Sequence, residues 1–111
     1  MDIQKILNFI EQVKSLWQEH IHAINYTGFS IAGKRSLDVF VKTNVGFSVY
    51  LDINRSVKRQ LENLNLLLNQ EIKPETYSGL SYVDVRLPNI AYYCYQDAPC
   101  APEFVTSSPK L

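Results

Sequence analysis

The stretch SLDVFVKTNVGFSVYLDI, residues 36–53, carries the clearest structural signal in the sequence. Apolar and polar residues alternate on both sides of Asn44–Gly46, a segment whose glycine suits a tight turn. Alternation with a period of two around such a turn predicts a β-hairpin with one face on a core and one toward water. The predicted core face comprises Leu37, Val39, Val41, Phe47, Val49, Leu51 and Ile53, and the outer face comprises Asp38, Phe40, Lys42, Ser48, Tyr50 and Asp52.

Two amphipathic helices are predicted on either side of this hairpin. The first runs from Asp2 to about Gln18 and the second from Ser56 to about Glu71, with Asp2 and Ser56 as N-caps. We interpret both apolar stripes as core-facing, because a membrane-surface helix would be basic on its polar face. The stripes are Ile3, Ile6, Leu7, Ile10, Val13, Leu16 and Trp17 in the first helix, and Val57, Leu61, Leu64, Leu67 and Leu68 in the second.

A second hairpin is predicted over residues 82–95, on either side of Pro88–Asn89. Because proline cannot adopt the positive φ of primed hairpin turns, a longer or bulged loop is the alternative to a two-residue turn there. A two-residue turn would place Val83, Val85, Leu87, Ile90, Tyr92 and Cys94 on the core side and Tyr82, Asp84, Arg86, Ala91, Tyr93 and Tyr95 on the outer side.

These elements predict one α+β domain over residues 1–95. A strand is also expected within residues 23–30, so the order is helix, strand, hairpin, helix, hairpin. Such an order favours an antiparallel or mixed β-sheet with the two helices packed on one face. Residues 96–111 contain three prolines and no sustained period, which predicts a disordered tail.

Composition limits the classes of function. The chain has 111 residues, of which 46% are hydrophobic, and eleven basic and eleven acidic residues give a formal net charge of zero. A neutral chain without a basic run argues against a nucleic-acid-binding protein. No apolar stretch approaches the ~18 residues of a transmembrane helix and no signal peptide follows Met1, so a complete chain would be expected in the cytoplasm.

Few residues suggest catalysis or metal binding, and no cofactor is predicted. His20 and His22 could contribute to a metal site, but no further ligands cluster near them in the sequence. Asp38, Asp52 and Asp84 are expected as separate carboxylates on the outer faces of strands. A small enzyme that combines Asp38 and Asp52 with one of the histidines is therefore the less favoured alternative to a binding domain.

The two cysteines, Cys94 and Cys100, have five residues between them, which is not the C-x-x-C spacing of zinc or redox motifs. Outside the cytoplasm they could form a disulfide, and inside it they would be free thiols. The sequence leaves both possibilities open.

Tyr82, Tyr93 and Tyr95 are predicted on the outer side of the closing hairpin. Tyrosine adds a large contact area at a low entropy cost, which favours a binding surface, although cross-strand packing explains the same residues equally well. The last strand would also present unpaired backbone groups to which a partner could add a strand. A protein-binding domain is therefore the class of function that we favour.

The segment LENLNLLLNQEIKPETYSGLSYVDVRLPNIAYYC, residues 61–94, resembles the C-terminal end of the FtsQ/DivIB family of bacterial cell division proteins. The resemblance lies in a leucine-rich helix, a short loop, the motif YVDVR at Tyr82–Arg86, a turn and a tyrosine-rich last strand. It covers about residues 3–95 and is sharpest over residues 80–93. Cys94 stands where the family commonly has a basic residue, and a cysteine-bearing tail is not typical of the family.

The resemblance implies that the chain is the β domain of a longer protein, and that the membrane helix and POTRA domain that precede this domain in the family are not included. Such a protein is a non-enzymatic scaffold for septum assembly on the extracytoplasmic face of the cytoplasmic membrane. Its expected partners are FtsB/DivIC-like and FtsL-like single-span division proteins, without nucleic acid or small-molecule substrate.

The family also suggests where the partner binds, because its last strand serves as the edge to which the FtsB-like partner adds a strand. On this chain, the implied partner-binding residues are Ile90, Ala91, Tyr92, Tyr93 and Cys94 in the last strand, together with Tyr82, Asp84 and Arg86 in the neighbouring strand.

Overall fold

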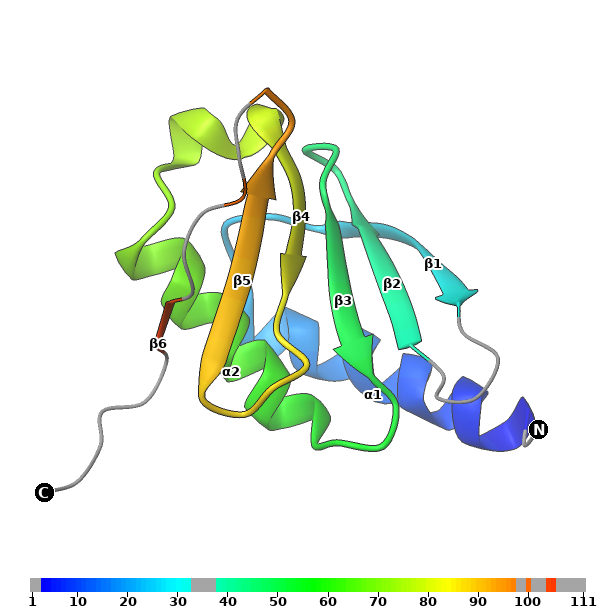
Figure 1. Ribbon diagram of the computed structural model, residues 1–111. Coiled ribbons are helices and arrows are strands. Elements are labelled where there is room, and N and C mark those ends of the chain that lie inside the picture. Colours follow the sequence, from blue (N-terminus) through cyan, green and yellow to red (C-terminus); the bar gives the residue numbers. More distant parts are fainter. Residues whose placement is uncertain (1–2, 33–37, 98–99, 101–103, 106–111) are drawn as a thin grey trace, which may run out of the picture.

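The computed structural model describes residues 3–32, 38–97, 100 and 104–105 of the chain. Within these described residues, two helices, a 3-10 helix and six strands follow one another along the sequence, and Figure 1 shows their arrangement. In chain order they are α1 (Ile3–His20), β1 (Tyr26–Ala32), β2 (Asp38–Thr43), β3 (Ser48–Asp52), α2 (Val57–Gln70), η1 (Pro74–Gly79), β4 (Leu80–Asp84), β5 (Ile90–Tyr95) and β6 (Phe104–Val105). No helix among these described residues is both long and apolar enough to span a membrane.

The strands form a mixed sheet in the order β1-β2-β3-β4-β5-β6. All neighbouring strands are antiparallel except β3 and β4, which are parallel and are joined through α2 and η1. A parallel pair requires a crossover of this kind, because a tight turn cannot reverse the chain twice. Both α1 and α2 cover the same face of the sheet (Figure 1), which confirms the predicted α+β class.

The first hairpin forms as its alternation predicts. Val39 pairs with Leu51 and Val41 with Val49, and all four side chains are fully buried. Gly46 has a φ of 107° and donates its N–H to the carbonyl of Thr43, as a glycine in the left-handed region does in a three-residue hairpin loop. The predicted strand start at Leu37 lies outside the described residues.

Helix α1 confirms most of the predicted stripe and differs from it at three positions. The buried residues are Ile6, Phe9, Val13 and Trp17, which follow a helical spacing of three and four residues. Phe9 was not in the predicted stripe, whereas Ile3 and Leu7 were and are exposed. Ile10 and Leu16 are partly buried against the core, so the stripe is covered except at Ile3 and Leu7 near the start of the helix. The predicted N-cap, Asp2, lies outside the described residues.

Helix α2 agrees closely with its prediction. Ser56 caps the helix, and its hydroxyl accepts a hydrogen bond of 3.2 Å from the N–H of Arg59. Every residue of the predicted leucine stripe is buried. Two polar side chains that the stripe does not predict, Gln60 and Asn63, are also buried at 1% exposure.

Gln60 holds the connection between β3 and α2. Its Oε1 accepts a 2.7 Å hydrogen bond from the N–H of Asp52, and its Nε2 donates to the carbonyls of Asp52, Arg55 and Ser56. Removing a buried amide that hydrogen-bonds several backbone groups should lower the stability of the fold. Each backbone group that loses its partner stays away from water without a compensating hydrogen bond.

We expect Gln60→Ala to lower the free energy of unfolding by about 1–2 kcal/mol, since the part-buried backbone groups regain only some hydrogen bonds from water. Urea denaturation measures the change. Gln70→Ala, at an exposed position of the same helix, is the matched control and should change stability by less than about 0.5 kcal/mol. Equal effects of the two variants would show that helix propensity, and not the buried amide, is responsible.

The closing hairpin has a longer loop than a two-residue turn. β4 ends at Asp84 and β5 begins at Ile90, and Asp84 pairs with Tyr92, Val83 with Tyr93 and Tyr82 with Cys94. The faces of β5 assigned from a two-residue turn are therefore wrong: Ala91 and Tyr93 turn to the helices, and Ile90 and Tyr92 turn away from them.

The physical reason lies in the loop itself. Pro88 cannot adopt the positive φ of a primed turn, and one extra residue of register turns every side chain of a strand to the opposite face. The loop is held by α2 instead, because Asn63 Nδ2 and Arg59 Nε donate hydrogen bonds of 2.8 Å and 3.2 Å to the carbonyl of Pro88.

Parts of the predicted disordered tail have a defined place. Phe104 and Val105 form β6, which pairs antiparallel with Ala91 and Ile90 of β5. Cys100 forms a disulfide with Cys94. The tail residues 98–99, 101–103 and 106–111 lie outside the described residues.

Candidate partner-binding surface

The candidate site lies on the open face, by which we mean the side of the sheet opposite α1 and α2. Its residues in the two hairpins alternate with the buried ones along each strand. From the partner-binding residues implied by the sequence, the register places Tyr82, Asp84, Ile90, Tyr92 and Cys94 on this face, with Arg86 beside them. Ala91 and Tyr93 are buried toward the helices instead.

An aromatic row crosses the open face. The ring of Phe40 stacks on Tyr50 at 4.3 Å between centroids, and Tyr50 stacks on Tyr82 at 4.8 Å with an angle of 7° between the planes. Because the rings cover each other's faces, they present mainly their edges to solvent. Burial, together with the neighbouring Tyr82 and Asp84, raises the pKa of Tyr50, so this ring stays neutral. The row thus both packs the sheet and forms a rigid, amphipathic surface.

Arg86 organises the charges beside this row. Its Nε and Nη2 donate to the two carboxylate oxygens of Asp84 at 2.9 Å and 2.7 Å, and its Nη1 donates to Asp38 Oδ2 at 2.8 Å. The guanidinium also lies 5.6 Å from the centroid of the Tyr50 ring. The Asp84 hydrogen bond is the main cause that raises the pKa of Arg86 above its usual range. Arg86 therefore joins β2, β3 and β4 at one end of the sheet.

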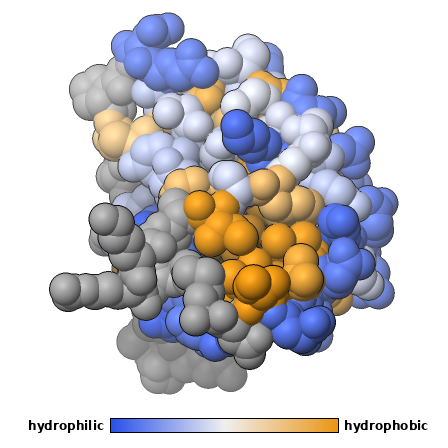
Figure 2. Space-filling view, turned by 90° about the vertical axis from the view of Figure 1, so that its right-hand side faces the viewer, coloured by the Kyte–Doolittle hydropathy of each residue, from blue (hydrophilic) through white to orange (hydrophobic). Residues whose placement is uncertain are grey.

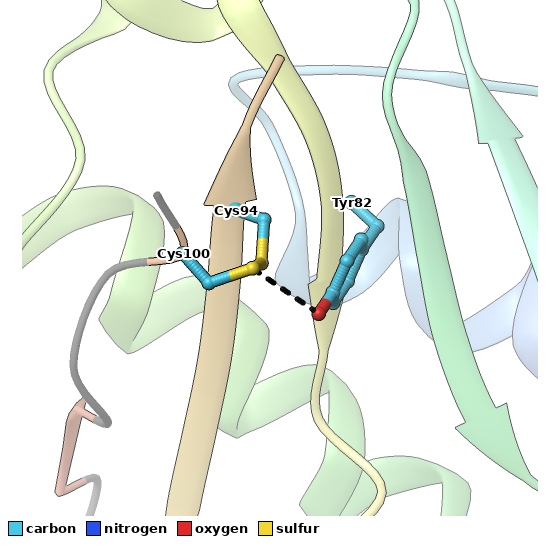
Figure 3. The surroundings of a disulfide bond; sticks show 3 residues. All are labelled: Tyr82, Cys94 and Cys100. Carbon is cyan, nitrogen blue, oxygen red and sulfur yellow. Dashed lines mark hydrogen bonds between the residues drawn. A yellow bond between two sulfur atoms is a disulfide. The ribbon is translucent and has the colours of Figure 1, made fainter. Parts of the chain in front are cut away.

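The disulfide between Cys94 and Cys100 lies on the open face at the end of the aromatic row, next to Tyr82 (Figure 3). The hydroxyl of Tyr82 lies 3.9 Å from Cys100 Sγ and is the donor, because a disulfide sulfur carries no proton. Of the two possibilities left open by the sequence, the structure has the bridged form. The bridge ties the tail to β5.

Among the described residues, the pairing at the outer edge of β5 covers two positions. β6 pairs with Ile90 and Ala91, and no other described residue pairs with this edge at Tyr92, Tyr93, Cys94 or Tyr95. The tail thus reaches the first two residues of the strand that was implied as the edge for a partner. The structure also shows that this edge accepts an antiparallel strand.

Tyr93 and Tyr95 do not lie on the outer side of the hairpin as a two-residue turn would place them. The hydroxyl of Tyr93 donates to Glu71 Oε2 at the end of α2, and the hydroxyl of Tyr95 lies 3.1 Å from Thr76 Oγ1 in η1. Both rings therefore pack the hairpin against the helical layer. Of the three tyrosines predicted outside, only Tyr82 remains on the open face.

The contribution of Tyr93 to stability should be lost at alkaline pH. Burial, with the hydrogen bond to Glu71, raises the pKa of Tyr93 to about 12, whereas an unfolded tyrosine titrates near ~10. The contribution of this group is fully present below about pH 10 and is lost as the pH rises toward 12, because the unfolded chain releases its proton first. Urea denaturation between about pH 8 and pH 11.5 should show a falling free energy of unfolding, with a smaller slope in Tyr93→Phe. An unchanged slope in the variant would contradict this assignment.

The aspartates and histidines of the alternative enzyme are not brought together. Asp38, Asp52 and Asp84 line one hollow of about 380 Å³ on the open face, where Asp52 pairs with Arg55 at 3.3 Å and the other two pair with Arg86. His20 ends α1 and lines a different hollow, beside α2. Within the part of the chain that the structure describes, no group of three or more His, Cys, Asp or Glu side chains could hold a metal ion.

Phe40 and Tyr50 are aromatic residues of this surface that were not assigned to the site from the sequence. Their alternation places them on the outer face of the first hairpin, but it does not show that this hairpin lies beside the second one. The parallel pairing of β3 with β4 brings the two hairpins side by side, and no local sequence pattern predicts this pairing.

Comparisons of this chain with protein-family models, with curated proteins and with solved structures found no match.

Proposed function

We propose that this chain is a non-enzymatic protein-interaction domain in bacterial septum assembly, and that an FtsB/DivIC-like partner adds a strand to β5. One observation carries the strand addition: β5 is six residues long, and among the described residues its outer edge pairs with a strand of two residues. Unpaired backbone groups at such an edge favour pairing with another chain. The role in division is supported by the resemblance of residues 80–93 to the FtsQ/DivIB family.

The side chains next to the edge suit a protein partner. Ile90 and Tyr92 are half-buried on the open face, and Asp84 lies opposite Tyr92 on the neighbouring strand. A strand added to β5 would place every second side chain against Ile90 and Tyr92, so apolar residues at those positions would bury them. The stacked Tyr82 and Tyr50 keep this surface rigid, which lowers the entropy cost of binding.

The disulfide supports a location outside the cytoplasm, on the extracytoplasmic face of the membrane. Disulfides persist in oxidising compartments and are rare where thiols are kept reduced. The Cys94–Cys100 bridge is therefore consistent with the compartment that the resemblance implies. An FtsL-like protein is proposed as the second partner on the resemblance alone.

A protein-binding domain outside cell division is the second candidate. The aromatic row and the β5 edge favour a protein partner whatever the pathway, since neither feature depends on the family resemblance. The two candidates differ in the identity of the partner and not in the surface that binds it.

The test is a titration of the 15N-labelled full chain with a peptide that covers the extracytoplasmic segment of an FtsB/DivIC-like protein from the same genome. We expect the largest amide shifts at residues 90–95. Ile90→Asp should weaken binding, whereas Ile31→Asp, at the opposite edge of the sheet, should leave it unchanged. Binding without shifts at residues 90–95 would overturn strand addition, and no binding would overturn the role in division.

A further inference from the structure

The edge of the sheet opposite β5 is formed by β1, which among the described residues has a neighbouring strand on one side only. Its seven residues, YTGFSIA, include neither a charge nor a proline, although edge strands usually carry one to prevent pairing with other chains. A register shift affects only the start of the strand, and residues from Gly28 to Ala32 pair regularly with β2. β1 therefore offers a regular, uncharged edge.

An apolar patch adjoins this edge. Ile31 of β1 is 48% exposed, and Ile3 and Leu7 of α1 are 67% and 50% exposed. Figure 2, which views the side of the molecule that carries β1 and the start of α1, shows a continuous hydrophobic area with hydrophilic residues along its right-hand side. An apolar patch beside an unpaired strand edge is typical of a protein–protein contact.

We propose that β1 pairs with β1 of a second copy of this chain, antiparallel about a two-fold axis at Ser30. The two sheets would then form one continuous sheet with all four helices on the same face. In this register Phe29 of each copy faces Ile31 of the other, and the two Ser30 residues face each other. Such an interface is isologous and closes at two copies.

The pattern of apolar residues in β1 indicates that the partner at this edge is a second copy of the chain. Phe29 pairs with Val41 and Ile31 with Val39, and since both valines are buried, Phe29 and Ile31 lie on the helix side. An added strand should be apolar on that side, where it would meet the exposed Ile31, and β1 itself is apolar there. The pairing would cover each exposed Ile31 with an aromatic ring, a favourable cross-strand combination.

Charge does not oppose this dimer. The formal net charge of the chain is zero, so two copies do not repel each other over a distance. One charged side chain that contacts β1 is Lys14, whose ammonium lies 5.9 Å from the centroid of the Phe29 ring within the same copy. The proposal uses the edge opposite β5, so it does not depend on the proposed function.

Sedimentation equilibrium of the full chain from about 1 µM to about 1 mM tests the dimer, because this range covers weak interfaces of small area. We expect the mass to rise toward twice that of one chain. Ile31→Lys should remain monomeric, because it places two charges in the interface. Leu87→Lys is the matched control: Leu87 is 43% exposed in the loop after β4, so this variant should dimerise like the wild type. A monomer at every concentration, or equal loss in both variants, would overturn the proposal.

A cross-linking experiment tests the register. With oxidised glutathione as the oxidant, two Ser30→Cys chains should form a disulfide, giving up two protons and two electrons to the glutathione disulfide. Lys42→Cys, exposed one strand further into the sheet, should cross-link far more slowly. Equal rates would overturn the register.

A lipid surface is the competing occupant of the patch. If the wild type stays monomeric and binds vesicles of phosphatidylethanolamine and phosphatidylglycerol, and Ile31→Lys abolishes that binding, the patch faces lipid and the dimer is wrong. Ile31→Lys should keep its affinity for a partner at β5, so failure of the dimer and failure of the proposed function are distinguishable.

Discussion

Replacing Arg86 with methionine should lower the free energy of unfolding by about 3 kcal/mol at pH 7. Removing one member of a hydrogen-bonded ion network leaves its partners uncompensated, which costs ~3–5 kcal/mol for fully buried pairs. The side chain of Arg86 is 35% exposed, so water screens part of the loss and the lower end applies. Urea denaturation measures the change. Arg55→Met, which removes the 3.3 Å pair with Asp52 from a more exposed site, should cost less than about 1 kcal/mol.

A second substitution identifies the cause. Without Arg86, the carboxylates of Asp38 and Asp84 lose the guanidinium to which both of them are hydrogen-bonded. Arg86→Met combined with Asp84→Asn removes one of these two negative charges and should restore part of the loss at pH 7. A loss that Asp84→Asn does not reduce would show that packing on Tyr50, and not charge, is what Arg86 contributes.

Releasing the tail from β5 should raise the affinity for a partner strand about tenfold. If β6 occupies the edge nine-tenths of the time, the apparent dissociation constant is about ten times the intrinsic one. β6 has only two residues, and ordering each costs ~1–2 kcal/mol of backbone entropy, so it depends on the disulfide that holds Cys100 next to Cys94. The double variant Cys94→Ser/Cys100→Ser should therefore expose the edge.

Hydrogen exchange separates this effect from general unfolding. Loss of the short disulfide loop should cost about 2 kcal/mol of stability, and the amides of Ile90 and Ala91 should exchange faster than those of β2 and β3. Peptide titration by calorimetry then gives the affinity. Truncation after Asp97 combined with Cys94→Ser is a second variant and should behave alike. A weaker affinity in both variants would mean that the tail contributes to the binding surface and does not compete with the partner.

Local sequence patterns determined the elements that are stabilised by contacts between residues close to one another in the sequence. The period of two in residues 38–52, with Gly46 at the turn, was sufficient for the first hairpin and its faces. The Ser56 cap and the leucine stripe were sufficient for α2. In each case the decisive interactions join residues a few positions apart, so the sequence contains them directly.

The tertiary structure alone decided how these elements meet. The parallel pairing of β3 and β4 joins segments separated by a whole helix, and it brings Tyr50 against Tyr82 and Asp38 to Arg86. The loop around Pro88 decided which face of β5 carries Tyr92 and which carries Tyr93, since a shift of one residue exchanges the two faces. The place of β6 and the bridge between Cys94 and Cys100 depend on contacts across the sheet edge. These features follow from packing between distant segments, for which a single sequence has no local signal.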